Sequence, residues 1–350
     1  MLVLLHRWLG VFAGSVLILL SLSGFLLLWM DEYLDWRYPA LPDNAGLIAP
    51  DAKLIEAIFL SADPQVASLG MPTASRPFYH AYLAGGGQQV YHPTSGELLA
   101  SWTWIDSVPL FLFELHARLI MGEVGHLAVG VTGIVYVISI VSGLLVWLRR
   151  RRIFRVRFLL PTSVNWVSLL KSHAAQGVAM SLLFLATSVT GIAMVFPDPF
   201  RVALNYGFGV SGTLRPQVWE VAAHSGEIDW SRILVATEKA LPNAALRFVT
   251  PPRTDTSPLM LRLRMPTELH PNGRSYLAVV PKSGEILEVI RAPELGLGPI
   301  IFDAFYPVHS GKTNWFGHRF VLGLVSLSLL YLAVSGLSIF VQRRTFWRRP

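Results

Sequence analysis

Four long apolar stretches alternate with polar segments along this chain of 350 residues. Each contains a run of about 20 residues that is nearly free of charge, the length at which an α-helix crosses a bilayer core of about 30 Å. We expect transmembrane helices within 1–30, 111–148, 173–196 and 309–342. The pattern therefore predicts a membrane α-helical, four-span bundle.

The two longer polar segments, 31–110 and 197–308, carry short alternating runs separated by Gly and Pro. Examples are the strands around the glycines at 85–87, the run LMLRLRMP at 259–266 and the stretch 274–290. Alternation with period two indicates strands with one buried face. We therefore expect an α+β structure in both segments.

Composition agrees with a membrane protein, because 53% of the residues are hydrophobic and only 15% are charged. Basic residues gather in the connection 149–172 and in the tail 343–350, and cytoplasmic loops are enriched in Lys and Arg. In a bacterial inner membrane this places both termini in the cytoplasm and both polar segments in the periplasm. Topology thus accounts for the net charge of +7, and we expect no nucleic-acid partner.

The absence of cysteine excludes disulfides and thiolate metal ligands, so any transition metal needs His, Met or carboxylate. Histidines recur with the apolar stretches at matched spacings. His6 precedes Gly24 by 18 residues, as His173 precedes Gly191. A second separation, of 27 residues, also occurs twice: from His116 to Gly143 and from His309 to Gly336.

The chain thus consists of two parallel repeats, a pattern that the turn P-x-S-G-E at 93–97 and again at 281–285 supports. An axis along the membrane normal would relate the repeats and bring equivalent side chains together. We therefore expect His6 to face His173, and His116 to face His309. Two imidazoles on opposite sides of an axis form a bis-His site suited to haem iron.

His126 and His318 are further candidates, since they lie near the expected outer edge of the hydrocarbon if the helices are straight. The separations of His126 from Gly143 and of His318 from Gly336 differ by one residue, so the two histidines do not occupy equivalent positions of the repeats. His116 and His309 do, which favours that pair. If all six bind, the chain holds up to three haems. Arg7, Arg118 and Arg319 flank these histidines as candidate partners of haem propionates, or as lipid-facing charges.

Other polar residues have simpler interpretations. Arg262, Arg264 and Arg274 either attract an anionic substrate or form one polar strand face. We interpret the remaining histidines as ordinary surface residues, namely His80, His92, His224 and His270.

The chain resembles the PepSY-associated transmembrane-helix family of bacterial inner-membrane proteins over nearly its whole length. The resemblance rests on HRWLG at 6–10, LHARLIMGEVG at 115–125 with VSGLLVW at 141–147, the helix from SHAAQG to VTG, and VHSG at 308–311 with VSGL at 334–337. It implies PepSY-like periplasmic segments and haem-dependent reduction of ferric siderophores. It also marks His6, His173, His116 and His309 as motif positions. At His126 and His318 the family often has arginine, so the chain departs from the pattern there.

We expect an inner-membrane haem-b oxidoreductase with about two haems per chain that reduces a periplasmic ferric siderophore and releases ferrous iron. The chain has no G-x-G-x-x-G after a strand, P-loop, Ser-His-Asp motif or H-E-x-x-H. Electrons would therefore come from quinol or a cytoplasmic reductase. Alternatives are a non-enzymatic regulatory or binding module of PepSY type, and an iron or haem transporter.

Overall fold

The computed structural model describes residues 1–37, 49–62, 65–74, 76–103, 105–149, 154–211, 220–221, 223, 228–313 and 315–346. The chain divides into two compact units. The helical unit comprises Met1–Met30, Phe111–Pro199 and Val308–Pro350, and the sheet unit comprises Asp31–Leu110 and Phe200–Pro307. His224 and the arginines at 150–152 lie outside the described residues.

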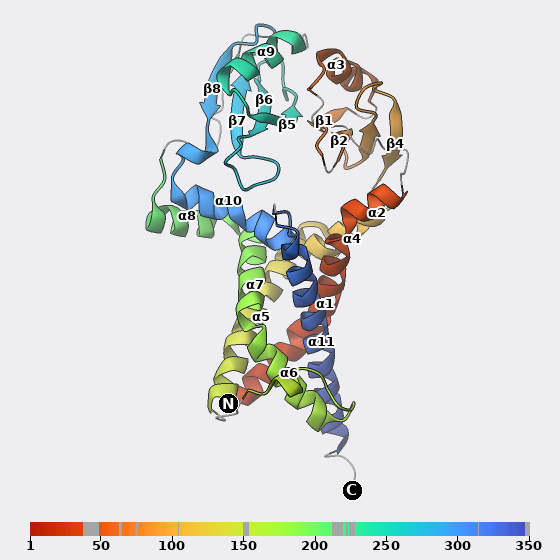
Figure 1. Ribbon diagram of the computed structural model, residues 1–350, viewed down its shortest axis with the longest axis vertical. Coiled ribbons are helices and arrows are strands. Elements are labelled where there is room, and N and C mark those ends of the chain that lie inside the picture. Colours follow the sequence, from red (N-terminus) through yellow and green to blue (C-terminus); the bar gives the residue numbers. More distant parts are fainter. Residues whose placement is uncertain are drawn as a thin grey trace. The chain divides into compact units, whose positions relative to one another are not determined.

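Three helices of the helical unit are long and apolar enough to span a membrane: α1 (Leu2–Leu27), α5 (Gly122–Arg149) and α11 (Gly317–Phe346). Two shorter helices, α6 (Trp166–Ala179) and α7 (Ser181–Val195), meet at a bend of 66° and count as a fourth span if they form one broken crossing. These helices run side by side in Figure 1, where α1 packs against both α5 and α11. Buried apolar side chains such as Ala13, Tyr136 and Phe184 form their common core.

Besides 173–196, which the bend between α6 and α7 divides, two more of the expected continuous helices are interrupted. The segment 111–148 contains α4 (Val108–Arg118) and α5, separated at Leu119 and Ile120, whose φ angles are 50° and 60°. Such left-handed residues cannot continue a right-handed helix. The segment 309–342 is likewise divided, because α10 (Leu297–Ser310) ends before α11 begins. His116 and His309 therefore lie on short helices that precede the spans.

The sheet unit contains one antiparallel sheet of eight strands in the order β4-β3-β2-β1-β5-β6-β7-β8. The first four strands are β1 (Val66–Gly70), β2 (Tyr79–Leu83), β3 (Gln88–Tyr91) and β4 (Leu98–Trp102). The last four are β5 (Ala245–Thr250), β6 (Leu259–Arg264), β7 (Ser275–Val279) and β8 (Ile286–Ile290). The two polar segments of the sequence thus share a sheet through the pairing of β1 with β5.

One face of this sheet packs on α3 (Ala52–Ser61) and α9 (Trp230–Ala240), whose side chains join Leu261 and Leu277 in the largest apolar core. The two P-x-S-G-E turns connect β3 to β4 and β7 to β8. Gly96 and Gly284 in these turns have φ angles of 71° and 70°, a conformation that glycine adopts without strain. The remaining helices are α2 (Met30–Arg37), α8 (Pro197–Phe208) and the short 3₁₀ turns Val156–Phe158 and Ala292–Glu294.

Candidate functional site

Histidines of the helical unit meet in two pairs. The ring centroids of His6, near the start of α1, and His173, on α6, are 6.3 Å apart, with an angle of 74° between the ring planes. The centroids of His116, on α4, and His309, on α10, are 6.2 Å apart, with an angle of 54°. The structure therefore brings together the two pairs that the spacing to the glycines favours.

The Nδ1 atom of each paired histidine is occupied by an acceptor on a different helix. In three of them Nδ1 donates to a backbone carbonyl: that of Ser139 for His6 (3.0 Å), Leu20 for His116 (2.9 Å) and Thr187 for His309 (3.0 Å). Nδ1 of His173 contacts the Ser335 hydroxyl at 3.0 Å. A carbonyl only accepts, so in His6, His116 and His309 the proton is on Nδ1 and the lone pair is on Nε2. The Ser335 hydroxyl donates its own proton to the Leu332 carbonyl at 3.2 Å, so it accepts from His173 and the same tautomer follows. This is the tautomer in which Nε2 ligates a metal and Nδ1–H is held by an outer partner.

The spacing within each pair suits one metal ion between the rings. With metal–nitrogen bonds of about 2 Å and a ring radius of about 1.1 Å, two opposed imidazoles have centroids about 6 Å apart. Among the described residues no cluster of three or more His, Cys, Asp or Glu offers a complete metal site. A metal held at either pair would thus take most of its ligands from a non-protein group, as iron does in a porphyrin.

A cavity of about 240 Å³ adjoins the pair His6 and His173. Gly10 and Gly177, each four residues after a histidine and so on the same helix face, line it, and a Cβ atom at either glycine would meet nothing within 4 Å. The open space at these glycines leaves room for a flat ligand beside the rings. The residues present therefore fit a haem at this pair.

Two guanidinium groups also line this cavity. The Arg7 guanidinium lies 5.3 Å from the centre of the Phe340 ring, and the Arg343 guanidinium lies 5.4 Å from the centre of the Trp166 ring. Among the described residues no carboxylate lines the cavity, so its charged groups suit an anion such as a haem propionate. Sequence reasoning missed Arg343, although it lies seven residues after Gly336 and thus two helical turns away on the same face of α11.

The other candidate residues have partners outside the two histidine pairs. His126 donates from Nδ1 to the Ala117 carbonyl at 3.1 Å, whereas His318 stacks on Trp315 and contacts the Thr313 hydroxyl. No ring contact joins His126 to His318 in the described part of the chain. Arg118 pairs with Glu114 at 2.6 Å, and Arg319 donates to the Leu28 carbonyl while its guanidinium lies 5.0 Å from the centre of the Trp29 ring. Of the three flanking arginines, only Arg7 lines the cavity.

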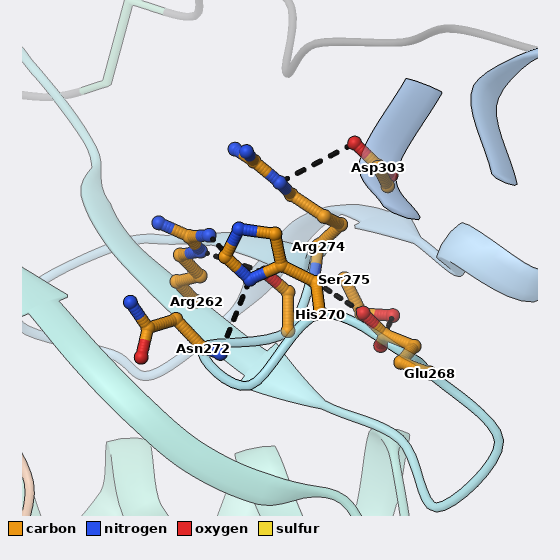
Figure 2. A network of polar contacts seen from close by, with 8 residues as sticks. Arg262, Glu268, His270, Asn272, Arg274, Ser275 and Asp303 are labelled. Atoms are coloured by element: carbon orange, nitrogen blue, oxygen red, sulfur yellow. Dashed lines mark hydrogen bonds and ion pairs between the residues drawn. The ribbon is translucent and has the colours of Figure 1, made fainter. Parts of the chain in front are cut away.

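The sheet unit holds a separate polar network (Figure 2). The Glu268 carboxylate accepts hydrogen bonds from the backbone amides of Met265 and Arg274 and from the Ser275 hydroxyl. Arg262 donates to the Gly273 carbonyl at 2.9 Å, Arg264 to the Glu268 carbonyl, and Arg274 pairs with Asp303 at 3.3 Å. The three arginines thus fix the loop 265–274, which explains them without an anionic substrate.

The interpretation of His270 and His80 as ordinary surface residues was wrong, because the sheet unit buries both at least in part. His270 is only 4% exposed and stacks on Tyr306, and its Nδ1 accepts from the Asn272 amide at 3.1 Å. Burial, together with the neighbouring Arg274, lowers the pKa of His270 to about 2. His80 is half-buried, donates from Nε2 to Gln88, and has a pKa lowered to about 4, mainly by burial.

The family of the chain follows from a comparison of its sequence with known proteins. A family model described as the PepSY-associated TM region matches residues 3–343. The chain belongs to this family. No protein of curated function matches it. In this member of the PepSY-associated family, the matched region contains both histidine pairs and all eight strands of the sheet.

Proposed function

We propose that this PepSY-associated membrane protein is a haem-b oxidoreductase that carries electrons across the bacterial inner membrane and reduces a periplasmic ferric siderophore. The observation that carries the proposal is the pair of matched histidine sites, with centroid separations of 6.3 and 6.2 Å and Nδ1 occupied in every ring. Bound haem would supply a one-electron iron centre, and the histidines that would hold it, their burial and their hydrogen bonds would set its potential.

In this proposal His6 and His173 hold one haem, and His116 and His309 hold a second. Arg7 and Arg343 bind the propionates of the first through charge-assisted hydrogen bonds. From His6 to Gly24, which α1 places beside His116, the helix rises about 27 Å. The two sites would therefore lie near opposite faces of the membrane, as electron transfer across it requires.

We further propose four spans, with α6 and α7 as one broken crossing, and two parallel repeats. The basic flanks 149–172 and 343–350 favour cytoplasmic termini, which places the sheet unit in the periplasm. Equivalent contacts support the repeats: His6 lies against Gly143 and His173 against Gly336, whereas His116 lies against Gly24 and His309 against Gly191. Quinol or a cytoplasmic reductase is the electron donor in this scheme, and lipid surrounds the helices.

The first experiment is an optical spectrum of the detergent-purified protein, oxidised and dithionite-reduced, with haem quantified per chain after expression with ample haem. We expect sharp α and β bands of low-spin haem b and about two haems per chain. Adding a ferric siderophore to the reduced protein should re-oxidise the haem and release ferrous iron, which a ferrous chelator detects.

The outcome separates this proposal from other functions. A colourless protein contradicts the reductase and favours a regulatory or binding module, which needs no haem. A coloured protein that the ferric siderophore does not re-oxidise contradicts siderophore reduction. Transport of iron or haem would instead appear as flux into proteoliposomes without a change in the haem spectrum.

A further inference from the structure

Each paired histidine packs against a glycine of another helix. A Cβ atom on Gly143 would lie 2.9 Å from the Cε1 atom of His6, and one on Gly24 would lie 2.9 Å from that of His116. The corresponding distances are 3.0 Å for Gly191 and His309, and 3.3 Å for Gly336 and His173. A methyl group at Gly143 or Gly24 would displace the ring, whereas at Gly191 or Gly336 the ring would have to shift by a few tenths of an ångström.

The residue before each glycine carries a hydroxyl that contacts the same histidine. The distances from Nδ1 are 3.2 Å for Ser142 and His6, 3.2 Å for Ser23 and His116, 3.1 Å for Thr190 and His309, and 3.0 Å for Ser335 and His173. Each hydroxyl donates its own proton to a carbonyl of its helix. It therefore accepts from Nδ1–H and adds a second acceptor at that proton.

A backbone carbonyl on the same helix as each glycine completes the arrangement. Ser139, Leu20 and Thr187, whose carbonyls accept from Nδ1, each lie four residues before the glycine. Leu332, four residues before Gly336, supplies the backbone acceptor for His173. We call the glycine, the preceding hydroxyl residue and this carbonyl the Ser/Thr-Gly cradle. The same three-part cradle thus occurs under all four paired histidines.

We propose that the four Ser/Thr-Gly cradles position the paired histidines and tune the potential of the metal that each pair ligates. The inference rests on the proposed haem function and assigns roles to Ser23, Ser142, Thr190 and Ser335. Acceptors at Nδ1–H increase the electron density on Nε2, which favours the ferric state. The hydroxyl dipole, with its oxygen toward the ring, acts in the same direction.

Removing a hydroxyl should therefore raise the midpoint potential of one haem only. We expect Ser335→Ala to change the equilibrium constant for reduction of the haem at His6 and His173 by up to tenfold, about 59 mV for a one-electron couple. Ser142→Ala should act on the same haem, but less, because Nδ1 of His6 also donates to the Ser139 carbonyl at 3.0 Å and so keeps an acceptor. Ser23→Ala and Thr190→Ala should move the potential of the other haem.

Redox titration of the purified holoprotein, followed in the α band, measures these shifts. Ser335→Thr is the rescue variant, since Thr190 occupies the equivalent position in another cradle. Ser21→Ala is the matched control: Ser21 is buried on α1, its hydroxyl donates to the Leu17 carbonyl at 2.6 Å, and Ser23 lies two residues away. We expect wild-type potentials for both variants.

The glycine is tested separately by Gly143→Ala, which should greatly reduce the haem bound at the His6 pair. Gly133→Ala is the matched control on α5, because its Cβ would lie 2.8 Å from Ile192, a packing conflict of similar size that touches no histidine. If Gly133→Ala loses as much haem as Gly143→Ala, the effect is general packing, and a positioning role for Gly143 is wrong.

The results distinguish the cradle from the proposed function. A protein without haem overturns the haem proposal and, with it, this inference. A protein with low-spin haem whose potentials stay unchanged in all four hydroxyl variants retains the haem function and overturns the tuning role. A shift in Ser335→Ala that Ser335→Thr reverses, with Ser21→Ala unchanged, supports the cradle.

Discussion

The histidines of the helical unit and those of the sheet unit differ in what their ring nitrogens bind. In the helical unit, His6 and His116 donate from Nδ1 to backbone carbonyls. In the sheet unit, Nδ1 of His270 accepts from a backbone amide, and His80 donates from Nε2 to Gln88. The proton is thus on Nδ1 in His6 and His116 and on Nε2 in His270 and His80, so among these four histidines of the described chain the Nε2 lone pair is available in the two of the helical unit.

This difference separates a candidate ligand from a structural histidine. Burial alone does not, because His270 of the sheet unit is also buried. What matters is whether the partner fixes the proton on Nδ1 and whether a second imidazole lies about 6 Å away. His126 meets the first condition, through the Ala117 carbonyl, but no second imidazole is in ring contact with it among the described residues.

The largest expected effect comes from removing one ring of a pair. His173→Ala should abolish the haem bound between α1 and α6, because one imidazole cannot form a bis-His site. His270→Asn, which keeps an acceptor for the Asn272 amide, should leave the haem content unchanged. Haem per chain, measured from the pyridine haemochrome spectrum, tests both variants. Equal haem loss in the two variants would contradict the distinction between the units.

A smaller effect is expected from the guanidinium groups of the first pair's cavity. Arg7→Gln should weaken haem binding about tenfold, as expected for loss of one charge-assisted hydrogen bond. Arg343→Gln should act similarly, whereas Arg118→Gln should not, since Arg118 pairs with Glu114. Haem transfer to apomyoglobin measures the relative affinities. Unchanged affinity in the double variant of Arg7 and Arg343 would rule out propionate binding by these residues.

The smallest effect concerns the pH dependence of the sheet unit. Burial, opposed by Arg274, raises the pKa of Asp303 to about 6, so Asp303 stabilises the fold at low pH and loses this contribution as pH rises through 6. His270, whose pKa is lowered to about 2, acts oppositely: its contribution is present above about 6.5 and declines as pH falls. Between pH 4 and 6 the two should nearly cancel.

Single variants should expose each contribution. In Asp303→Asn, stability should fall by about 1.4 kcal/mol per pH unit as pH decreases from 6 to 4, and in His270→Asn it should rise by a similar amount. Hydrogen exchange of the β7 amides reports on the sheet unit separately from the helices. Identical pH profiles for the two variants would show that these groups do not act as described.

The sequence predicted the histidine pairs because the equal separations of 18 and of 27 residues from histidine to glycine mark equivalent positions of two repeats. In the fold each histidine contacts a glycine of the other set, so His6 lies against Gly143 and His116 against Gly24. It predicted β2, β3, β6 and β7 from their alternation, but not β1 or β5, whose central pairing joins segments 175 residues apart, from Gly70 to Ala245. The depth argument for His126 and His318 assumed straight helices. The left-handed residues Leu119 and Ile120 break that assumption and let α4 carry His116 back to Gly24.

Each pair takes one histidine from residues 1–126 and one from residues 173–309, and this division bears on how the protein is made. A growing chain presents His6 and His116 to the membrane long before their opposite rings exist. The first pair cannot form until His173 has been synthesised and inserted, and the second cannot form until His309 has. Capture of the proposed haems would therefore be a late step of biogenesis. A chain truncated before residue 173 contains two unmatched imidazoles, His6 and His116, whereas one truncated between residues 173 and 309 contains only His116 without its opposite ring.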